Sequence, residues 1–529
     1  YLASVLPVGS KVGVNADTLS VTEALDWDTS LAPLSEDSFG QDHSPNKADN
    51  LQVLVPLDDD LVEAIWESRP PRPARAIIKH PSEWSGRTTA EKVQWLRNKL
   101  DEAKADCIVL AMLDEIAWLL NLRGSDILYT PVFFSYLVLT HNNVLIFVAE
   151  NSLNDETRDY LESELGKVEI HPYEDRNSVL AHLDEIVAGR SKRKSRRGKM
   201  EPPSTIRVWM DPECSSIGLH LSCVAKPHIE VIAKPSPVKR EKALKDAEEV
   251  RGARKAHIYE GVALCRYFAW LEERVKEEPQ IDEVEASDKL ESFRALEPHY
   301  ISPSFTTISA AGSNSSVIHY SPSPETALLL SKDGFYLCDT GSQYTMGTTD
   351  MTRTLCFGEP TDFQRLAYTA VLEGHVAVAR AVFPEGTEPA KLDLLARTAL
   401  WRHGLDYRHG TSHGLGAALG VHEYPPLMSS RHPAPEDPSP GEKYNSRSMG
   451  PGMVLSNEPG FYLPGEFGIR LENVMVSRTC EESLPHAAKF DESQRWLDFE
   501  TISYIPMEPK LIDLDQLSED ALEWLNAYH

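Results

Sequence analysis

Two aspartates stand in strand-like sequence, Asp339 within Gly334–Tyr344 and Asp350 within Thr348–Thr354. Asp339 has the same parity as the apolar residues two and four positions before it, so its carboxylate falls on the apolar face of its strand. A Met-Gly turn between the segments would make the two aspartates face each other across a hairpin. Buried carboxylates need a cation or hydrogen bonds. A metal ion would meet this need, and so would a structural arrangement with Arg353 and the neighbouring threonines.

Three histidines follow, His409, His413 and His422. On a helix, the spacing of the first two would suggest a zinc site. Glycines at positions 410, 414 and 416 disfavour a helix and predict irregular strand and loop, where the backbone can approach a site closely. A single histidine is most often a packed core residue. From the pattern alone, both a structural and a functional interpretation stay open.

Two glutamates extend the candidate set, Glu458 before a Pro-Gly turn and Glu472 two residues after Arg470. Arg470 and Glu472 share one face of a predicted strand. Each carboxylate alone is most often part of an ion pair. The full set has four carboxylates, one imidazole and no thiolate: Asp339, Asp350, His413, Glu458 and Glu472. Such oxygen-rich ligands suit paired Mn²⁺, Co²⁺ or Zn²⁺, and two metals about 3.5–4 Å apart can share a water and lower its pKa.

The elements that must position these residues lie after about residue 241. The pattern predicts one long helix over Arg240–Glu277 and further helices over residues 362–382 and 388–403, with strand pairs between and after them. Residues 76–240 alternate helices and strands, which is typical of α/β layering. Before them, residues 60–68 read as a helix, and the Pro-rich segment 69–73 predicts a stiff linker and a domain boundary.

Composition narrows the function classes. The 529 residues carry a formal charge of −28, which disfavours nucleic-acid binding. The seven scattered cysteines predict neither a disulfide framework nor a thiolate zinc site and favour a reducing compartment. The start of the chain does not resemble a signal peptide, and residues 131–150 predict two buried strands and not a membrane span. We therefore expect a cytoplasmic protein that binds neither nucleic acid nor membranes. The basic run 190–199 predicts a solvated loop, and 429–448 a surface insertion.

In their order and setting, the five candidate ligands resemble those of the pita-bread metallopeptidases, the family of methionine aminopeptidase, prolidase and aminopeptidase P. Within this family the chain is most similar to the large cytosolic Xaa-Pro aminopeptidases (aminopeptidase P). The resemblance covers nearly the whole chain apart from the basic run and the insertion. It rests on motifs at Ala117–Asp126, Pro131–Tyr136, Ile318–Tyr320, Gly347–Asp350, Val421–Glu423, Phe467–Asn473, Phe499–Ile502 and Trp524–His529. Ser412 and Tyr424 stand where the family usually has glycine.

The resemblance implies an α/β (α+β) fold, with creatinase-like α/β N-terminal domains followed by a pita-bread catalytic domain. Residues 1–75 would be the remnant of a first creatinase-like domain, 76–240 a second one, and 241–529 the catalytic domain. Most of the first domain and a C-terminal extension that helps dimerisation would then be absent. The full-length protein is expected to form a homodimer.

The resemblance also implies a role for each ligand. Asp339 would chelate one divalent metal ion, and Asp350 and Glu472 would bridge two. His413 and Glu458 would hold the second ion. Glu458 would also accept the proton of a bridging water as it attacks the scissile carbonyl. The implied cofactor is a pair of divalent ions, and the family suggests Mn²⁺.

Five further residues would act on the substrate side. His422 and His319 would bind the substrate carbonyl and the developing negative charge. His409 would help to line a pocket for proline, and Arg470 with Tyr462 would support substrate and ligand geometry. Because an Xaa-Pro bond lacks an N–H, the pocket must accept a tertiary amide and a rigid ring.

The implied reaction removes the N-terminal residue from peptides with proline in second position, and such peptides are the expected partners. One alternative is prolidase, which cleaves Xaa-Pro dipeptides on the same fold. Another is a non-catalytic pita-bread binding domain. Retention of all five ligands and the three site histidines disfavours the binding domain.

Overall fold

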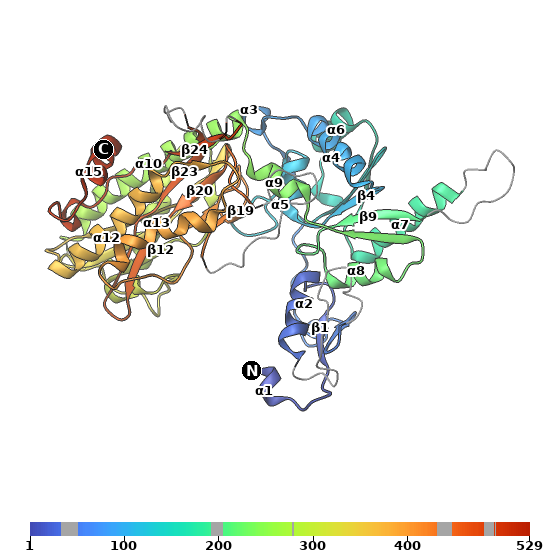
Figure 1. The fold of residues 1–529 in the computed structure, drawn as a ribbon, viewed down its shortest axis with the longest axis horizontal. Coiled ribbons are helices and arrows are strands. Elements are labelled where there is room, and N and C mark those ends of the chain that lie inside the picture. The colour runs from blue at the N-terminus through green and yellow to red at the C-terminus, as the bar shows by residue number, and fades with distance from the viewer. Residues whose placement is uncertain (33–50, 192–204, 278–279, 431–446, 481–490, 492) are drawn as a thin grey trace. The chain divides into compact units, whose positions relative to one another are not determined.

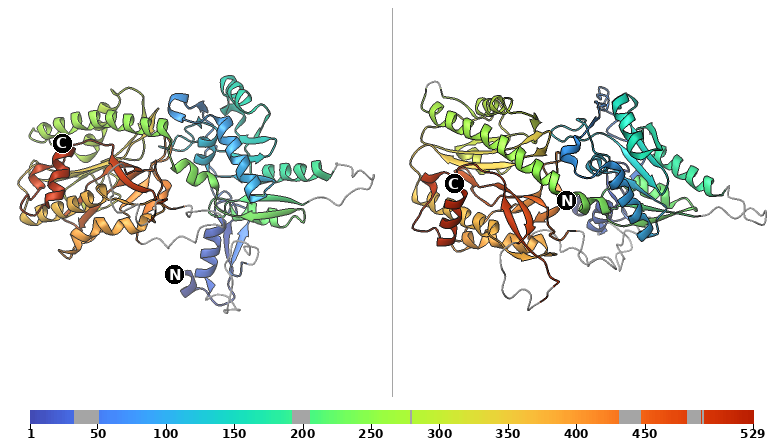
Figure 2. Two further views of the ribbon diagram at one scale, coloured as in Figure 1. Left: turned by 45° about the horizontal axis from the view of Figure 1, so that its top comes forward. Right: turned by 90° about the horizontal axis from the view of Figure 1, so that it is seen from above.

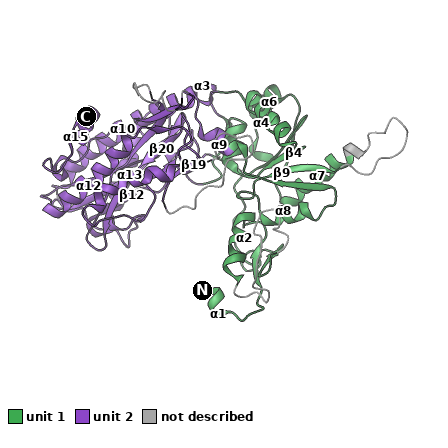
Figure 3. Ribbon diagram, in the orientation of Figure 1, with its two compact units in different colours: residues 1–79, 87–127, 132–238 green, residues 80–86, 128–131, 239–529 purple. Residues whose placement is uncertain are grey.

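The computed structural model describes residues 1–32, 51–191, 205–277, 280–430, 447–480, 491 and 493–529 (Figure 1). These residues form two compact units, coloured separately in Figure 3. The first comprises residues 1–79, 87–127 and 132–238, and the second residues 80–86, 128–131 and 239–529. Most of the basic run 190–199 and of the insertion 429–448 lies outside the described residues. No helix among the described residues is long and apolar enough to cross a membrane.

A six-stranded mixed sheet forms the body of the first unit. Its order is β10 (Ile229–Ala233), β9 (Ile206–Met210), β4 (Cys107–Leu110), β6 (Tyr136–Thr140), β7 (Val144–Val148) and β8 (Val168–Pro172). The helices are α4 (Thr89–Ala103), α5 (Leu113–Leu119), α6 (Asp155–Leu165), α7 (Arg176–Ser191) and α8 (Ile217–Val224). All five residues of β7 are buried, as predicted for the strand pair within 131–150. The α/β layering predicted for this region is confirmed.

A small element at the start of the chain packs against α8 within the first unit. Strands β1 (Val12–Asn15) and β2 (Leu54–Leu57) pair in parallel, and helix α2 (Val21–Ser30) contributes to the same apolar cluster. The helix predicted over residues 60–68 is wrong, because this segment forms turns. Leu61, Val62 and Ile65 are exposed there, so a helix would have no apolar contacts to stabilise it.

The second unit contains the elements that carry the candidate ligands. One three-stranded sheet has the order β12 (Ile308–Ala311), β13 (Phe335–Thr340) and β16 (Met351–Cys356). Another has the order β11 (Tyr300–Pro303), β14 (Ser342–Tyr344) and β15 (Gly347–Thr348). A six-stranded sheet has the order β17 (Phe383–Pro384), β24 (Trp496–Thr501), β23 (Asn473–Thr479), β20 (Val454–Asn457), β18 (Ser412–Gly414) and β19 (Glu423–Met428). Strands β21 (Gly460–Leu463) and β22 (Phe467–Arg470) form a hairpin.

The long helix predicted over Arg240–Glu277 is interrupted. Helix α9 (Pro237–Ala243) ends, and α10 (Ala247–Arg274) begins after Asp246. The Asp246 carboxylate accepts hydrogen bonds from the main-chain N–H groups of Glu248 and Glu249, and Glu249 bonds back to the Asp246 N–H. This reciprocal cap starts a new helix where the apolar periodicity alone suggested continuation.

Helices cover both faces of the six-stranded sheet. Val474 and Val476 of β23 share a cluster with Val250 of α10. Met475, between them, packs in another cluster with residues of α12 (Asp362–Ala379) and α13 (Pro389–Trp401). Since neighbouring residues of a strand point to opposite faces, α10 and the pair α12 and α13 lie on opposite sides, as Figure 2 shows. Both predicted helices near 362–382 and 388–403 are present.

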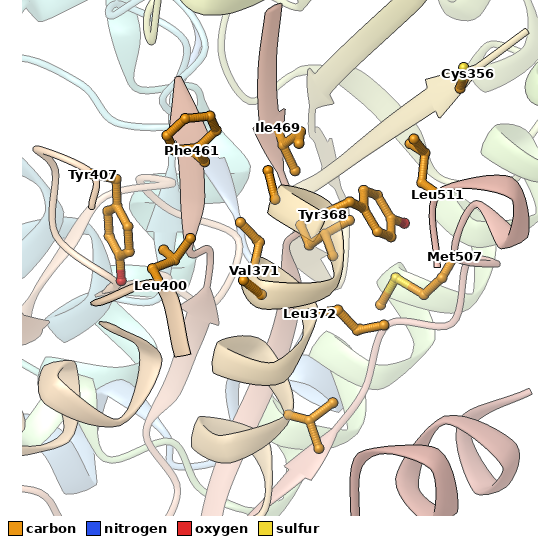
Figure 4. Packing of buried hydrophobic residues seen from close by; sticks show 14 of the residues in the cluster. Cys356, Tyr368, Val371, Leu372, Leu400, Tyr407, Phe461, Ile469, Met507 and Leu511 are labelled. Atoms are coloured by element: carbon orange, nitrogen blue, oxygen red, sulfur yellow. The ribbon is translucent and has the colours of Figure 1, made fainter. Parts of the chain in front are cut away.

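A further apolar cluster fixes the β21–β22 hairpin. Figure 4 shows Tyr368 and Val371 of α12 near Phe461 of β21 and Ile469 of β22. Leu471 belongs to the same cluster. The alternating residues Arg470 and Glu472 therefore take the other face, as the sequence pattern predicted.

Candidate metal centre

Asp339 and Asp350 come from the two neighbouring strands β13 and β16. The register places Asp339 opposite Thr352 and Thr340 opposite Met351. Asp350 directly precedes β16, so both carboxylates lie at the same end of the strand pair, and both are buried. The strand pair explains their proximity although ten residues separate them in the sequence.

His413 joins this pair from β18. Its Nε2 lies 3.3 Å from Asp350 Oδ2 and 3.6 Å from Glu458 Oε1. Its Nδ1 lies 3.0 Å from the Gly414 carbonyl oxygen. A hydrogen bond to that carbonyl requires the proton on Nδ1, which leaves Nε2 as the nitrogen that faces the carboxylates. The Glu458 main-chain N–H donates to Thr411 O at 2.9 Å, which fixes Glu458 beside the same strand.

Glu472 enters the centre from beyond the end of β22. Its N–H donates to Thr352 O at 3.1 Å, and its Oε2 accepts from the Thr352 hydroxyl at 2.6 Å. One ligand atom each of Asp350, His413 and Glu472 lies within 4.8 Å of the others. Thr352, which lies opposite Asp339 in the strand pair, therefore also holds Glu472, a candidate bridging ligand.

Arg470 is the buried cation of the site. Its Nη2 donates to Asp339 Oδ2, its Nη1 donates to the Tyr462 hydroxyl at 2.7 Å, and its Nε donates to Thr352 Oγ1 at 3.3 Å. The Tyr462 hydroxyl is also 3.0 Å from His409 Nε2. The guanidinium thus connects a candidate ligand with the predicted proline-side residues.

The other two substrate-side histidines lie near this network. The ring of His422 is 4.3 Å from that of His413, edge to face. His319 is exposed, yet it is close enough to add to the lowered pKa of both His409 and His422. The structure therefore brings together all ten predicted site residues, which span positions 319 to 472 of the sequence.

The ionisation of the site reflects burial and crowded charge. Burial, with repulsion from neighbouring carboxylates, raises the pKa of Asp350, Glu458 and Glu472. Burial lowers the pKa of His409 to about 3 and that of His422 to about 4. His413 behaves oppositely: although burial opposes it, the contacts with Asp350 and Glu458 raise its pKa to about 9.

The donor set fits divalent cations. Among the described residues, Asp339 Oδ1 and Glu472 Oε1 are buried oxygens without a hydrogen-bond partner. A buried carboxylate oxygen without a partner is costly. A divalent cation binds such hard oxygen ligands well. It would give the unpaired oxygens a partner and offset the repulsion between the carboxylates.

Arg353 does not neutralise the aspartates, so the structural alternative in the sequence is wrong on this point. Within the described part of the chain, its guanidinium donates to Glu472 O at 2.6 Å, to Asn473 Oδ1 at 2.8 Å and to Tyr528 Oη at 2.8 Å. The same alternative assigned the neighbouring threonines to the aspartates, whereas the Thr352 hydroxyl donates to Glu472. Sequence reasoning missed Asn473 and Tyr528 as supports. Their polar types in strand or helix patterns offered no signal for these pairings.

A second acidic group in the first unit has a structural explanation. Ligand atoms of Glu115, Asp211 and Cys214 also lie within 4.8 Å of one another. Glu115 accepts from the Ser236 hydroxyl at 2.7 Å, and Asp211 accepts from the N–H groups of Ser236 and Glu213 at 2.8 Å each. These carboxylates fix the end of the strand region before α9.

Family models match three stretches of the chain. Residues 68–249 match the creatinase/prolidase N-terminal domain, residues 251–478 match metallopeptidase family M24, and residues 495–529 match the C-terminal region of peptidase M24.

Named relatives extend the similarity over the chain. Aminopeptidase P1 of Arabidopsis thaliana is 37% identical over 556 residues, covering 100% of this chain and 81% of that protein. A probable Xaa-Pro aminopeptidase P of Arthroderma gypseum is 42% identical over 478 residues, covering 90% of this chain and 70% of that protein. The crystal structure of an X-prolyl aminopeptidase from Caenorhabditis elegans, described as a cytosolic enzyme with a di-nuclear active site, superposes with a TM-score of 0.84 at 31% identity. It covers 100% of this chain and 77% of that one.

Proposed function

Since this chain belongs to metallopeptidase family M24, we propose that it is a metal-dependent Xaa-Pro aminopeptidase, which removes the N-terminal residue from peptides with proline in second position. The observation that carries the proposal is the convergence of His413 with three buried carboxylates and the partly exposed Glu458. Two of the carboxylate oxygens lack partners, and burial lowers the pKa of the two histidines beside them, His409 and His422. The names of the relatives support this substrate class.

The proposed cofactor is a pair of divalent ions, most simply Mn²⁺ given the oxygen-rich ligands. Asp339 would hold one ion and Asp350 and Glu472 would bridge both. His413 and Glu458 would hold the other. Bound there, the ions would supply an activated water at neutral pH and polarise the substrate carbonyl.

The chain's own groups would handle protons and charge. Glu458 lies within the carboxylate group, and burial raises its pKa, which suits a group that accepts a proton from the attacking water near neutral pH. His422 is neutral at pH 7 and carries one N–H, which it can donate to an oxygen that gains negative charge. His319 would assist from the exposed side.

The proline side would be formed by His409 and Tyr462. Their mutual hydrogen bond at 3.0 Å and the Arg470 contact fix both rings. An aromatic wall of this kind can contact the apolar face of a pyrrolidine ring without needing an N–H from the scissile amide.

The test compares two substrates with and without metal. Metal-stripped protein is mixed with a peptide beginning Arg-Pro-Pro and, separately, with Gly-Pro dipeptide, before and after addition of Mn²⁺, Co²⁺ or Zn²⁺. We expect release of the first arginine only after metal is restored, with Mn²⁺ most effective. Cleavage of the dipeptide alone would establish prolidase instead. No cleavage of either, with bound metal counted, would favour a binding protein.

The larger organisation is part of the same proposal. Residues 1–75, 76–240 and 241–529 would correspond to part of a first creatinase-like domain, a second such domain and the catalytic domain. A cytoplasmic location is supported by the description of the nematode relative as cytosolic. Homodimerisation of the full-length protein is tested by light scattering.

A further inference from the structure

His319 differs from the other candidate site residues because its side chain is exposed. It lies in the segment 312–328, which connects β12 to the region before β13. An exposed side chain samples several rotamers, and holding one of them costs entropy. A histidine that must meet a substrate carbonyl therefore needs neighbours that fix its backbone.

Tyr320 provides one such restraint. Its side chain is 9% exposed, and its hydroxyl donates to Glu283 Oε2 at 2.6 Å. The residue directly after His319 is thus tied to a fully buried carboxylate.

Glu283, the first residue of α11 (Glu283–Arg294), accepts hydrogen bonds from several positions along this segment. Its Oε1 accepts from Ala311 N–H at 2.5 Å, and its Oε2 accepts from Leu328 N–H at 2.9 Å. The Asn314 amide donates to both oxygens, at 3.2 and 3.0 Å. Both oxygens of this buried carboxyl group are therefore occupied by donors from the segment and its two ends.

The candidate metal centre restrains the same segment from the opposite side. Arg470 Nη1 donates to Ile318 O at 3.4 Å, and Gly468 N–H donates to Ser315 Oγ at 2.7 Å. Any side chain at Gly468 would collide with Ser315 O, 1.8 Å from an ideal Cβ. The residues on both sides of His319 are therefore restrained: Arg470 bonds to Ile318, and Glu283 bonds to Tyr320.

We propose that Glu283 and Tyr320 are positioning residues that hold His319 toward the candidate metal centre. The inference rests on the proposed function, in which His319 binds the substrate carbonyl. Without the Tyr320 hydroxyl, the residue after His319 loses its hydrogen bond to Glu283 and keeps only its ring packing and its main-chain bond to Val317 O. The ligands and the proline-side residues are not touched by this change.

The test is a double-mutant cycle with Tyr320→Phe, His319→Ala and the double variant. With an Arg-Pro-Pro peptide, we expect Tyr320→Phe to lower kcat/KM roughly 10-fold, and His319→Ala to lower it roughly 100-fold. The double variant should be no worse than His319→Ala alone. Multiplied losses would overturn the inference, because Tyr320 would then act independently of His319.

A second readout is independent of catalysis. In metal-free protein, Tyr320→Phe should speed amide hydrogen exchange over residues 312–328, and unchanged exchange would overturn the inference. Tyr267→Phe is the matched control, since that buried hydroxyl is 2.7 Å from Tyr336 Oη and, in the part of the chain that the structure describes, bonds to no site residue. It should change neither kcat/KM nor exchange in this segment.

Failure of the inference is distinct from failure of the proposed function. If wild-type protein with metal cleaves no Xaa-Pro substrate, the function is wrong before any variant is made. If wild type is active and His319→Ala retains full kcat/KM, the enzyme stands and the positioning inference falls.

Discussion

Asp350 has the most central place among the candidate ligands. Its Oδ2 lies 3.3 Å from His413 Nε2, and one of its carboxylate oxygens lies within 4.8 Å of a carboxylate oxygen of Glu472. Burial raises its pKa. As the pH falls below this pKa, metal binding must displace a proton from the carboxylate, so metal affinity should fall as the pH is lowered.

Asp350→Asn should abolish peptide cleavage and reduce bound metal, because it removes a charged ligand that would serve both ions. The fold should persist, since its neighbours keep their strand pairing. Metal counting, activity and circular dichroism on the same samples check this. Asp362→Asn, on the exposed first turn of α12, is the control and should behave as wild type. Full metal content in Asp350→Asn would contradict the proposed centre.

His257, in the buried face of α10, makes folding sensitive to acid. Burial lowers its pKa to about 4 from the ordinary value of 6.5. Below pH 6.5 the unfolded chain binds a proton that the folded chain does not, so stability present above pH 6.5 is lost as the pH falls toward 4. The slope is roughly 1.4 kcal/mol per pH unit.

His257→Leu should therefore lose less stability than wild type between pH 7 and pH 5, by roughly 2 kcal/mol. Urea denaturation of metal-free protein at both pH values measures the difference. His403→Leu, at an exposed position, should lose as much stability as wild type between these two pH values. Equal pH dependence in His257→Leu and wild type would show that His257 is protonated as readily in the folded chain.

At the scale of elements, strand β19 is anchored by a buried ionic group. The Glu423 carboxylate accepts from Lys242 Nζ at 2.8 Å and from Lys245 Nζ, and all three side chains are almost inaccessible to solvent. Lys242 belongs to α9, and Lys245 lies between α9 and α10. The helix interruption thus places two ammonium groups directly behind the residue that follows His422.

Glu423→Gln should lower the free energy of unfolding by roughly 3–5 kcal/mol, because two buried ammonium groups lose their shared carboxylate. Chemical denaturation gives the value. Glu385→Gln is a comparison at a bidentate pair with Arg495, whose side chain is 59% exposed. For Glu385→Gln we expect the free energy of unfolding to fall by at most about 1 kcal/mol. Similar losses in the two variants would argue against a special role for the buried group.

The strands were more predictable than the helix boundaries. Asp339 on the apolar parity of β13, and the exclusion of a helix by glycines around His413, followed from local pattern because strand faces alternate strictly. The break between α9 and α10 could not be predicted in this way, because the apolar periodicity continues across it. The reciprocal cap at Asp246 is what marks the start of the new helix. Residues 60–68 show the opposite error: their sequence has a helical pattern, but their apolar side chains are exposed and find no apolar partner among the described residues.

The candidate site could be predicted as a set of residues and not as a network. Ligand types and order pointed to Asp339, Asp350, His413, Glu458 and Glu472. The pairing of Thr352 with Glu472, 120 positions apart, depends on tertiary packing that no local pattern encodes. The same holds for Glu283 and Tyr320.

On the scale of the whole molecule, the last helix supports the candidate centre. Tyr528, at the end of α15 (Glu519–Tyr528), accepts from Arg353 Nη2 at 2.8 Å and from Ile505 N–H at 2.9 Å. Arg353 in turn donates to the main-chain carbonyl of Glu472. A segment that contains no predicted ligand therefore fixes the backbone of one.

Tyr528→Phe should lower the free energy of unfolding by about 1–3 kcal/mol, because buried donors lose their acceptor. Weakened support for Glu472 should also reduce metal affinity roughly 10-fold. Denaturation of metal-free protein and metal competition with a chelator measure the two effects. Tyr504→Phe removes an exposed hydroxyl whose hydrogen bond, among the described residues, goes to Thr501 O, and this variant should show neither effect. Unchanged metal affinity in Tyr528→Phe would separate the last helix from the centre.

The position of Tyr528 also has a consequence for the order of events during protein synthesis. All five candidate ligands have been made once Glu472 is added, but the supporting hydroxyl follows 56 residues later. At roughly 5–20 residues per second, this leaves about 3–11 s in which the nascent chain holds its carboxylates without the last helix. The support for Glu472 is therefore complete only after Tyr528 has been synthesised, and we expect stable metal loading to follow that step.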